Sequence, residues 1–256
     1  MRQMITVTQL KSFEISVPKV LVGTTTHSNG SRMKVLKRNI LNLNAQECRD
    51  WGQLIMIDHS PESVAKEIIE MVKELPFSEK REVYWMHGEK PTGLWGKSAH
   101  QYILDLCQSK YYSFHSDDNF LAFNHLSSLC ALLDVHAELD FVFSHCYRIN
   151  QNKSIMRLNG FDLCETDLGS PLFRVDSCFR KVLPDLKVLP NVYAWDWEIM
   201  KVLTKAELKF ACSGLATYIW TQMHPCDEKT LEQSAIKKDI SKFKKIKAKY
   251  PGFKIY

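Results

Sequence analysis

The chain has 256 residues, of which 45% are hydrophobic and 25% are charged, a balance typical of a globular protein. This composition excludes an intrinsically disordered chain, a collagen-like fibre and a long coiled coil. The formal net charge of +5 is too small to indicate a nucleic-acid partner, and we expect none.

Two missing patterns bear on where the protein resides. No apolar run reaches the roughly 18 residues that a transmembrane helix needs. The start of the chain lacks the basic stretch and long apolar stretch of a secretory signal. We therefore expect a cytoplasmic protein. Its eight cysteines form no Cys-x-x-Cys pair, so we expect reduced, mostly buried thiols rather than a zinc site.

Apolar runs alternate with helical spacing along the first half of the chain, whereas residues 1–17 form a weakly patterned lead-in. The expected elements are a strand at 20–22 opening into a polar loop at 23–26, a helix at 31–43, a strand at 54–57, a helix after Pro61, a strand at 83–86, a helix around 99–106 and a strand at 111–114. This alternation predicts an α/β fold of Rossmann-like type, with a mostly parallel central sheet flanked by helices.

The second half of the chain is less regular. We expect a helix near 121–133, a strand at 141–144, loops with short strands over 150–180, and helices near 195–203 and 205–216.

Polar or acidic residues stand where the four strands of the first half end: Thr24, Asp58, His87 and Asp117. Ligands of open parallel sheets bind beyond the carboxyl ends of the strands, so we expect the site there. Asp58 can accept hydrogen bonds from a ribose or a base, and an Asx turn into the next helix is the alternative.

Two adjacent carboxylates, Asp117 and Asp118, directly follow the fourth strand. Such a pair can hold a divalent cation against a diphosphate, because Mg²⁺ takes few protein carboxylates and completes its shell with phosphate oxygens and water. The alternative is that Ser116 or Asp118 caps the next helix. The two roles are compatible.

Three further features carry weaker signals. Asp196 stands among aromatic residues, where a carboxylate can act as a general base, or it can simply begin a helix. The loop from Gly88 to Lys97, which includes Gly93, matches neither a dinucleotide fingerprint nor a P-loop. His224 is a candidate metal or phosphate contact, although a lone histidine is more often structural.

Taken in order over roughly 18–230, these pieces resemble a divergent inverting family 2 glycosyltransferase with the glycosyltransferase A-type fold. The resemblance lies in the succession of segments rather than in any single motif. The segments are Pro18–His27 for the opening strand and its loop, Leu54–Ser60 for the strand ending in an acid, Gly93–His100 for the entry to the third helix, Tyr111–Asn119 for the acidic motif, Trp195–Glu198 for the catalytic base and His224–Pro225 for a late histidine.

The resemblance implies a role for each matched residue. The residues implied at the nucleotide-sugar donor are Thr24, Thr26, Asp58, Gly93, Lys97 and Asp117. Asp117 and Asp118 would hold Mn²⁺ or Mg²⁺, with Asp118 favoured as the direct ligand and His224 as a further contact. Asp196 would deprotonate the acceptor hydroxyl.

The implied function is a metal-dependent, inverting transfer of a sugar from a nucleotide diphosphate, with a UDP-sugar favoured, to a hydroxyl of a glycan or lipid-linked acceptor. The resemblance implies one domain over 1–230, with a nucleotide-sugar half at 18–118 and an acceptor half at 119–230. The alternatives are a sugar-phosphate nucleotidyltransferase, or a non-catalytic nucleotide- or glycan-binding module. The loop Gly23–His27 lacks the basic signature of the former, and the retained carboxylates count against the latter.

The tail at 231–256 is rich in lysine, with eight lysines and one acid between 237 and 254. The favoured interpretation is a terminal helix that packs on the domain with its lysines in solvent. The alternative is a basic amphipathic helix lying on an anionic membrane surface, which would make the protein a peripheral membrane protein. The sequence does not indicate an oligomeric state.

Overall fold

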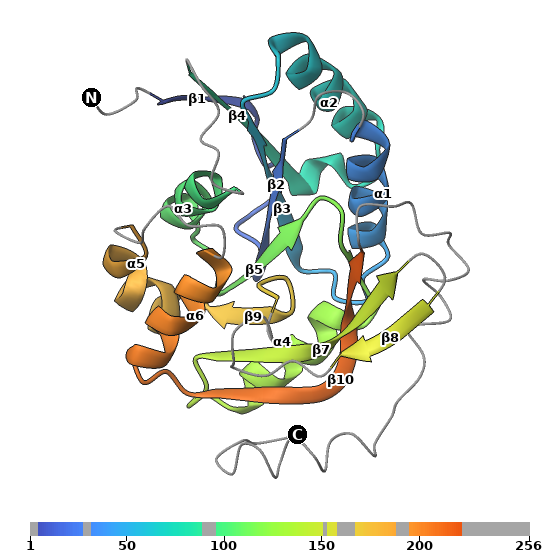
Figure 1. Cartoon of the computed structure of the whole chain (residues 1–256). Coiled ribbons are helices and arrows are strands. Elements are labelled where there is room, and N and C mark those ends of the chain that lie inside the picture. Colours follow the sequence, from blue (N-terminus) through green and yellow to red (C-terminus); the bar gives the residue numbers. More distant parts are fainter. Residues whose placement is uncertain are drawn as a thin grey trace.

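The computed structural model describes residues 5–27, 32–88, 96–150, 153–157, 167–187 and 195–221, which form one ten-stranded sheet flanked by six α-helices (Figure 1). The strands are β1 (Ile5–Lys11), β2 (Val20–Thr26), β3 (Trp51–Asp58), β4 (Arg81–Gly88), β5 (Tyr111–Ser116), β6 (Phe120–Leu121), β7 (Phe141–Asn150), β8 (Lys153–Arg157), β9 (Pro171–Arg174) and β10 (Phe210–Thr221). The helices are α1 (Met33–Asn44), α2 (Glu62–Glu74), α3 (Lys97–Leu106), α4 (His125–Val135), α5 (Arg180–Lys187) and α6 (Trp195–Lys205), with a 3-10 turn at Ser78–Lys80 and a π-helical segment at Val175–Phe179.

The strand order is β1-β4-β3-β2-β5-β9-β7-β10-β6, with β8 paired to β7. Strands β4, β3, β2 and β5 are parallel neighbours, which confirms the α/β fold and the parallel sheet expected for the first half. Because β2 lies between β3 and β5, the carboxyl ends of these three strands meet at one edge of the sheet. The second half adds antiparallel pairs through β9, β8 and β6.

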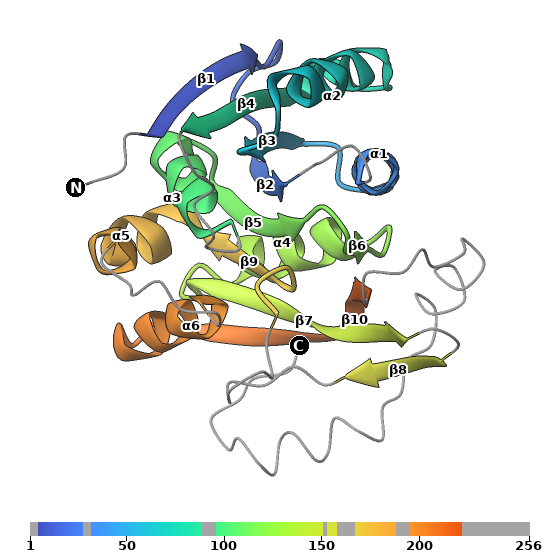
Figure 2. The same ribbon diagram turned by 45° about the horizontal axis from the view of Figure 1, so that its top comes forward.

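Helices cover both faces of the sheet. The apolar sides of α1 and α2 pack on β3 in one cluster, and α4 packs on β7 and β10 on the same face. Helices α3, α5 and α6 pack on the opposite face (Figure 1, left; Figure 2). Within the described ranges no helix is long and apolar enough to cross a membrane.

Three expectations for the secondary structure are wrong. Residues 5–11, in the weakly patterned lead-in where no element was expected, form β1, an edge strand antiparallel to β4. Residues 175–180, at the end of the stretch expected to be loops with short strands, lie in a π-helical segment and the first residue of α5. The helix expected at 205–216 is instead β10, which pairs with β7 through a register shift near Gly214, whose φ is +70°. Because β10 is largely buried on both faces, apolar and polar residues do not alternate cleanly along it, and its sequence cannot be distinguished from that of a buried helix.

A buried polar network lies between α1 and the sheet. The Gln53 amide donates to Thr24 Oγ1 at 2.9 Å, and Arg81 Nε donates to Gln53 Oε1 at 3.1 Å. On α1, Asn39 Nδ2 contacts His115 Nε2 at 2.7 Å, Ser116 O at 2.9 Å and Asn119 O at 3.1 Å. Buried polar groups of this kind are costly unless paired, so the network fixes α1 against the turn that follows β5.

Four buried histidines make stability depend on pH. Burial lowers the pKa of His100, His115 and His125 to about 3 and that of His145 to about 4, so all four are neutral in the folded protein. Below pH ~6.5 the unfolded chain binds protons that the folded chain does not. Each histidine then lowers the free energy of unfolding by up to about 1.4 kcal/mol per pH unit as the pH falls.

We therefore expect the urea midpoint of unfolding to fall steadily between pH 7 and pH 5. His125→Gln, which keeps a hydrogen-bonding partner for Thr217, should make the slope shallower by about one proton. His136→Gln, which removes a partly exposed histidine just after α4, is the matched control for the loss of an imidazole, and the slope should change less than in His125→Gln. A midpoint that stays constant from pH 7 to pH 5 would contradict the pKa values of the buried histidines.

Candidate functional site

The carboxyl ends of β2 and β5 bring three of the expected site residues together. Thr26, the last residue of β2, donates a 2.6 Å hydrogen bond from Oγ1 to Asp117 Oδ2. Asp118 follows directly and accepts a hydrogen bond from Ser116 Oγ on Oδ1. Asp117 is buried and Asp118 is partly exposed, so only the second carboxylate is open to the edge.

Arg32, immediately before α1, joins the two carboxylates. Its Nη2 lies 2.5 Å from Asp117 Oδ1 and 2.9 Å from Asp118 Oδ2. The Arg32 side chain is 30% exposed, so the guanidinium reaches the surface of the site. With these contacts each of the four carboxylate oxygens of Asp117 and Asp118 accepts a hydrogen bond from the chain.

Burial raises the pKa of Asp117 to about 6, against the opposing effects of Arg32 and the Thr26 hydroxyl, and the neighbouring Asp118 raises it further. A positive charge and a hydroxyl therefore favour the ionised carboxylate, against its burial. Removing a partner from a buried charge is far more destabilising than losing a surface pair.

The end of β3 adds Asp58 beside the same edge. Asp58 is buried, and its carboxylate contacts the ring of His59. His27, which follows β2, approaches the Asp58 carbonyl oxygen with its ring Nδ1 at 2.7 Å. His59 has φ of +50°, a strained conformation for a residue with a side chain, and such strain concentrates at functional sites.

The start of α3 reaches the edge from the other face of the sheet. Gly96 has φ of +78°, and a Cβ there would lie 2.7 Å from Thr25 Oγ1, so the helix begins against β2. Lys97 follows and is buried, and burial lowers the pKa of its ammonium group. The hydroxyl oxygen of Thr25 lies 3.5 Å from His100 Nε2.

Two of the sequence interpretations need correction. Thr24 is not at the strand end: β2 continues to Thr26, and the Thr24 side chain is fully buried with Gln53 donating to it. Its side chain supports the sheet and is not exposed at the carboxyl edge. The helix-cap alternative for Ser116 or Asp118 is also wrong, because β6 follows the turn and α4 begins only after Asn124.

Three expected site residues lie wholly or partly outside the part of the chain that the structure describes. Gly93 and His224 fall outside the described residues, as does the tail at 231–256. Asp196 lies in the first turn of α6, which confirms the helix expected there, and the placement of its side chain is not described. Its role as a base stays a prediction.

Sequence reasoning missed Arg32 and Asn39, and it considered Ser116 only as a helix cap rather than as a hydrogen-bond donor to Asp118. Arg32 carried a usable signal, because a cation at the start of a helix is unfavourable to the helix dipole and calls for an acidic partner. The role of Asn39 could not be predicted, because an amide inside an amphipathic helix shows no pattern until its partners are known.

Two hard carboxylate donors at this edge fit the chemistry of Mg²⁺ or Mn²⁺. The oxygens that face each other, Asp117 Oδ1 and Asp118 Oδ2, are the two that bind Arg32 Nη2. A cation and the guanidinium would therefore compete for the same oxygens. Across the described part of the chain no group of three or more His, Cys, Asp or Glu side chains could hold a metal ion.

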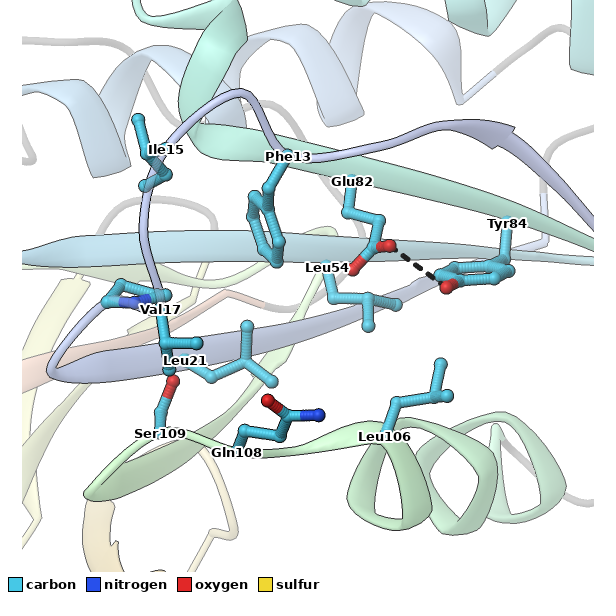
Figure 3. A pocket seen from close by; sticks show the side chains of 11 residues that line it. Phe13, Ile15, Val17, Leu21, Leu54, Glu82, Tyr84, Leu106, Gln108 and Ser109 are labelled. Carbon is cyan, nitrogen blue, oxygen red and sulfur yellow. Dashed lines mark hydrogen bonds between the residues drawn. The ribbon is translucent and has the colours of Figure 1, made fainter.

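A separate pocket of about 260 Å³ lies near the amino ends of the parallel strands (Figure 3). Phe13, Leu21 and Leu54 line it, together with Glu82, which accepts a hydrogen bond from the Tyr84 hydroxyl at 2.9 Å. Asp117 and Asp118 follow the carboxyl end of β5, whereas this pocket includes Ser109, before β5 begins. The pocket is therefore distinct from the carboxyl-edge site.

The fold is that of solved structures of TarS from S. aureus, a glycosyltransferase with the A-type fold, as expected from the sequence. The structure of TarS 1–349 with UDP-GlcNAc superposes with a TM-score of 0.63 at 14% identity, covering 81% of this chain and 60% of that one. The structure of TarS 1–349 with UDP superposes with a TM-score of 0.59 at 16% identity, covering 80% of this chain and 60% of that one. A further structure of S. aureus TarS superposes with a TM-score of 0.60 at 16% identity, covering 80% of this chain and 37% of that one.

The chain thus spans about 60% of the TarS 1–349 structures that it resembles. No protein-family model matches the sequence, and no curated protein matches it. At 14–16% identity the likeness establishes the fold and leaves the activity to be argued from the site.

Thr26→Val tests the contact on which the acidic pair depends. The change keeps the shape of the side chain but removes the donor to Asp117, and a hydrogen bond to a charged group contributes about 1.5–3 kcal/mol. We expect urea unfolding at pH 8 to show a loss of that size, with Thr26→Ser recovering most of it. Thr25→Val, on the opposite face of β2, is the matched control and should cost much less. Equal stability of Thr26→Val and the wild type would contradict the contact.

Proposed function

We propose that the protein transfers a sugar from a nucleotide diphosphate donor, with a UDP-sugar favoured, to a hydroxyl of a glycan or lipid-linked acceptor, with inversion at the anomeric carbon. The observation that carries the proposal is the constellation of Thr26, Asp58, Asp117 and Asp118 at the carboxyl edge of β2, β3 and β5. The fold supports it, because TarS has the same fold and has been solved with UDP and with UDP-GlcNAc.

The donor end of the reaction follows from the positions of these groups. In an open parallel sheet the ligand lies beyond the carboxyl ends of the strands, where Asp58 can accept hydrogen bonds from the ribose or base. Asp118, the more exposed of the acidic pair, faces the diphosphate together with Arg32. Lys97 at the start of α3 adds positive charge on the other face of the sheet. A divalent cation, when bound, would offset charge developing on the leaving diphosphate.

The acceptor end of the proposal rests on Asp196. As general base it would take the proton of the acceptor hydroxyl while the oxygen attacks the anomeric carbon and the bond to the diphosphate breaks on the opposite side. One proton moves to the carboxylate, and the nucleoside diphosphate leaves with the bonding electron pair. General-base help of this kind is typically worth about 10²–10⁴-fold in rate.

Asp196→Asn should therefore lower the release of UDP from UDP-GlcNAc in the presence of an acceptor by about 10²–10⁴-fold. The affinity for UDP, measured by calorimetry, should stay within a few-fold of the wild type, because the proposed base acts on the acceptor hydroxyl rather than on the nucleotide. Glu198→Gln is the matched control: this acid lies on the same helix and pairs with Lys201.

Three outcomes separate the proposal from its alternatives. Wild-type activity in Asp196→Asn would refute the role of the base. Binding of UDP without any turnover, by the wild type as well, would favour a non-catalytic binding module. Release of pyrophosphate from a nucleoside triphosphate and a sugar phosphate would favour a nucleotidyltransferase.

A further inference from the structure

We propose that Arg32 is a built-in competitor for the divalent cation: in the free protein its guanidinium occupies the Asp117–Asp118 pair, and a nucleotide diphosphate draws it away. Cation and nucleotide would then bind cooperatively, each making room for the other. The inference rests on the proposed function for the identity of the nucleotide, whereas the competition itself concerns only residues of this chain.

The competition follows from the geometry of one nitrogen atom. Arg32 Nη2 contacts Asp117 Oδ1 at 2.5 Å and Asp118 Oδ2 at 2.9 Å. The remaining two carboxylate oxygens accept from the Thr26 and Ser116 hydroxyls. A cation shared by the two carboxylates needs the oxygens that Nη2 holds, and a positive guanidinium left beside it would repel it.

The position of Arg32 is fixed by the fold rather than by the ion pair alone. Asn39, seven residues further along α1, contacts Ser116 O at 2.9 Å and Asn119 O at 3.1 Å. These contacts bracket the two acidic residues, so both ends of their turn are tied to the helix that begins next to Arg32. The guanidinium is thereby held facing the pair in the free protein.

The Arg32 guanidinium can also move from the two carboxylates to a phosphate group. The side chain is 30% exposed, and its hydrogen bonds within the described ranges all come from Nη2. Once Nη2 has left the carboxylates, the guanidinium can bind phosphate oxygens through two parallel hydrogen bonds. The first turn of α1 carries no acidic residue, so the positive end of its dipole also favours an anion at this edge.

Charge supplies the reason for the coupling. Two carboxylates and one guanidinium leave the site with a net negative charge, which opposes a diphosphate on its own. A cation on the carboxylates together with the guanidinium on the diphosphate gives each negative group a positive partner, whereas either ligand alone leaves one group without such a partner. Linkage then requires that nucleotide raise the affinity for the cation by the same factor as the cation raises that for nucleotide.

The test is a titration of Mn²⁺, followed by electron paramagnetic resonance of the free ion, with and without UDP. For the wild type we expect UDP to tighten Mn²⁺ binding by about 5- to 150-fold, the usual range of coupling between two sites. Arg32→Gln should bind Mn²⁺ without UDP at least about fivefold more tightly than the wild type, and its coupling to UDP should shrink.

Two variants accompany this measurement. Arg38→Gln removes an arginine from the same helix, one that lies over the Phe120 ring, and should titrate like the wild type. Arg32→Lys keeps the positive charge and should bind Mn²⁺ as weakly as the wild type without UDP, which tests the idea even if Arg32→Gln does not fold.

Mn²⁺ affinity in Arg32→Gln equal to that of the wild type would overturn the competition, as would tight Mn²⁺ binding by the wild type without UDP. Tight Mn²⁺ binding by Arg32→Lys would overturn it too. Failure of UDP to bind any variant would instead contradict the proposed function, while the Mn²⁺ titrations without UDP would still decide whether Arg32 competes.

Discussion

The site depends on one buried amide, that of Asn39. Its side chain ties α1 to the backbone at both ends of the turn after β5, and it lies next to Gln53 and His115 in the polar network beneath the helix. An unpaired amide in this place would cost about 1–3 kcal/mol, so the helix can dock in one register only. That register sets where Arg32 stands relative to Asp117 and Asp118.

The acidic pair shows how the fold tolerates a buried charge at its edge. Asp117 is almost fully buried, and burial alone pushes its pKa upward. Thr26 from one strand and Arg32 from the helix keep it ionised at neutral pH, while Asp118 remains partly exposed. We therefore assign the two acids different roles: Asp117 anchors the turn, and Asp118 faces the diphosphate of the proposed donor.

Sequence reasoning predicted the elements that hydrophobic periodicity reveals. The parallel core of β2 to β5, helices α1 to α3, and the carboxyl-edge position of Asp58, Asp117 and Asp118 follow from alternation and strand ends. Thr24 was misjudged because a strand that ends in three threonines gives no sign of where pairing stops. β10 was misjudged because burial on both faces removes the period of two, and Arg32 was missed because its partners are 85 and 86 residues away.

The most direct test of the account is a crystal structure of the protein with UDP. The account predicts the uridine beside Asp58 and the diphosphate at the carboxyl edge, next to Asp118 and Arg32. UDP bound in the pocket lined by Phe13, Leu54 and Tyr84, near the amino ends of the strands, would contradict it, because none of the residues assigned to the donor reaches that pocket.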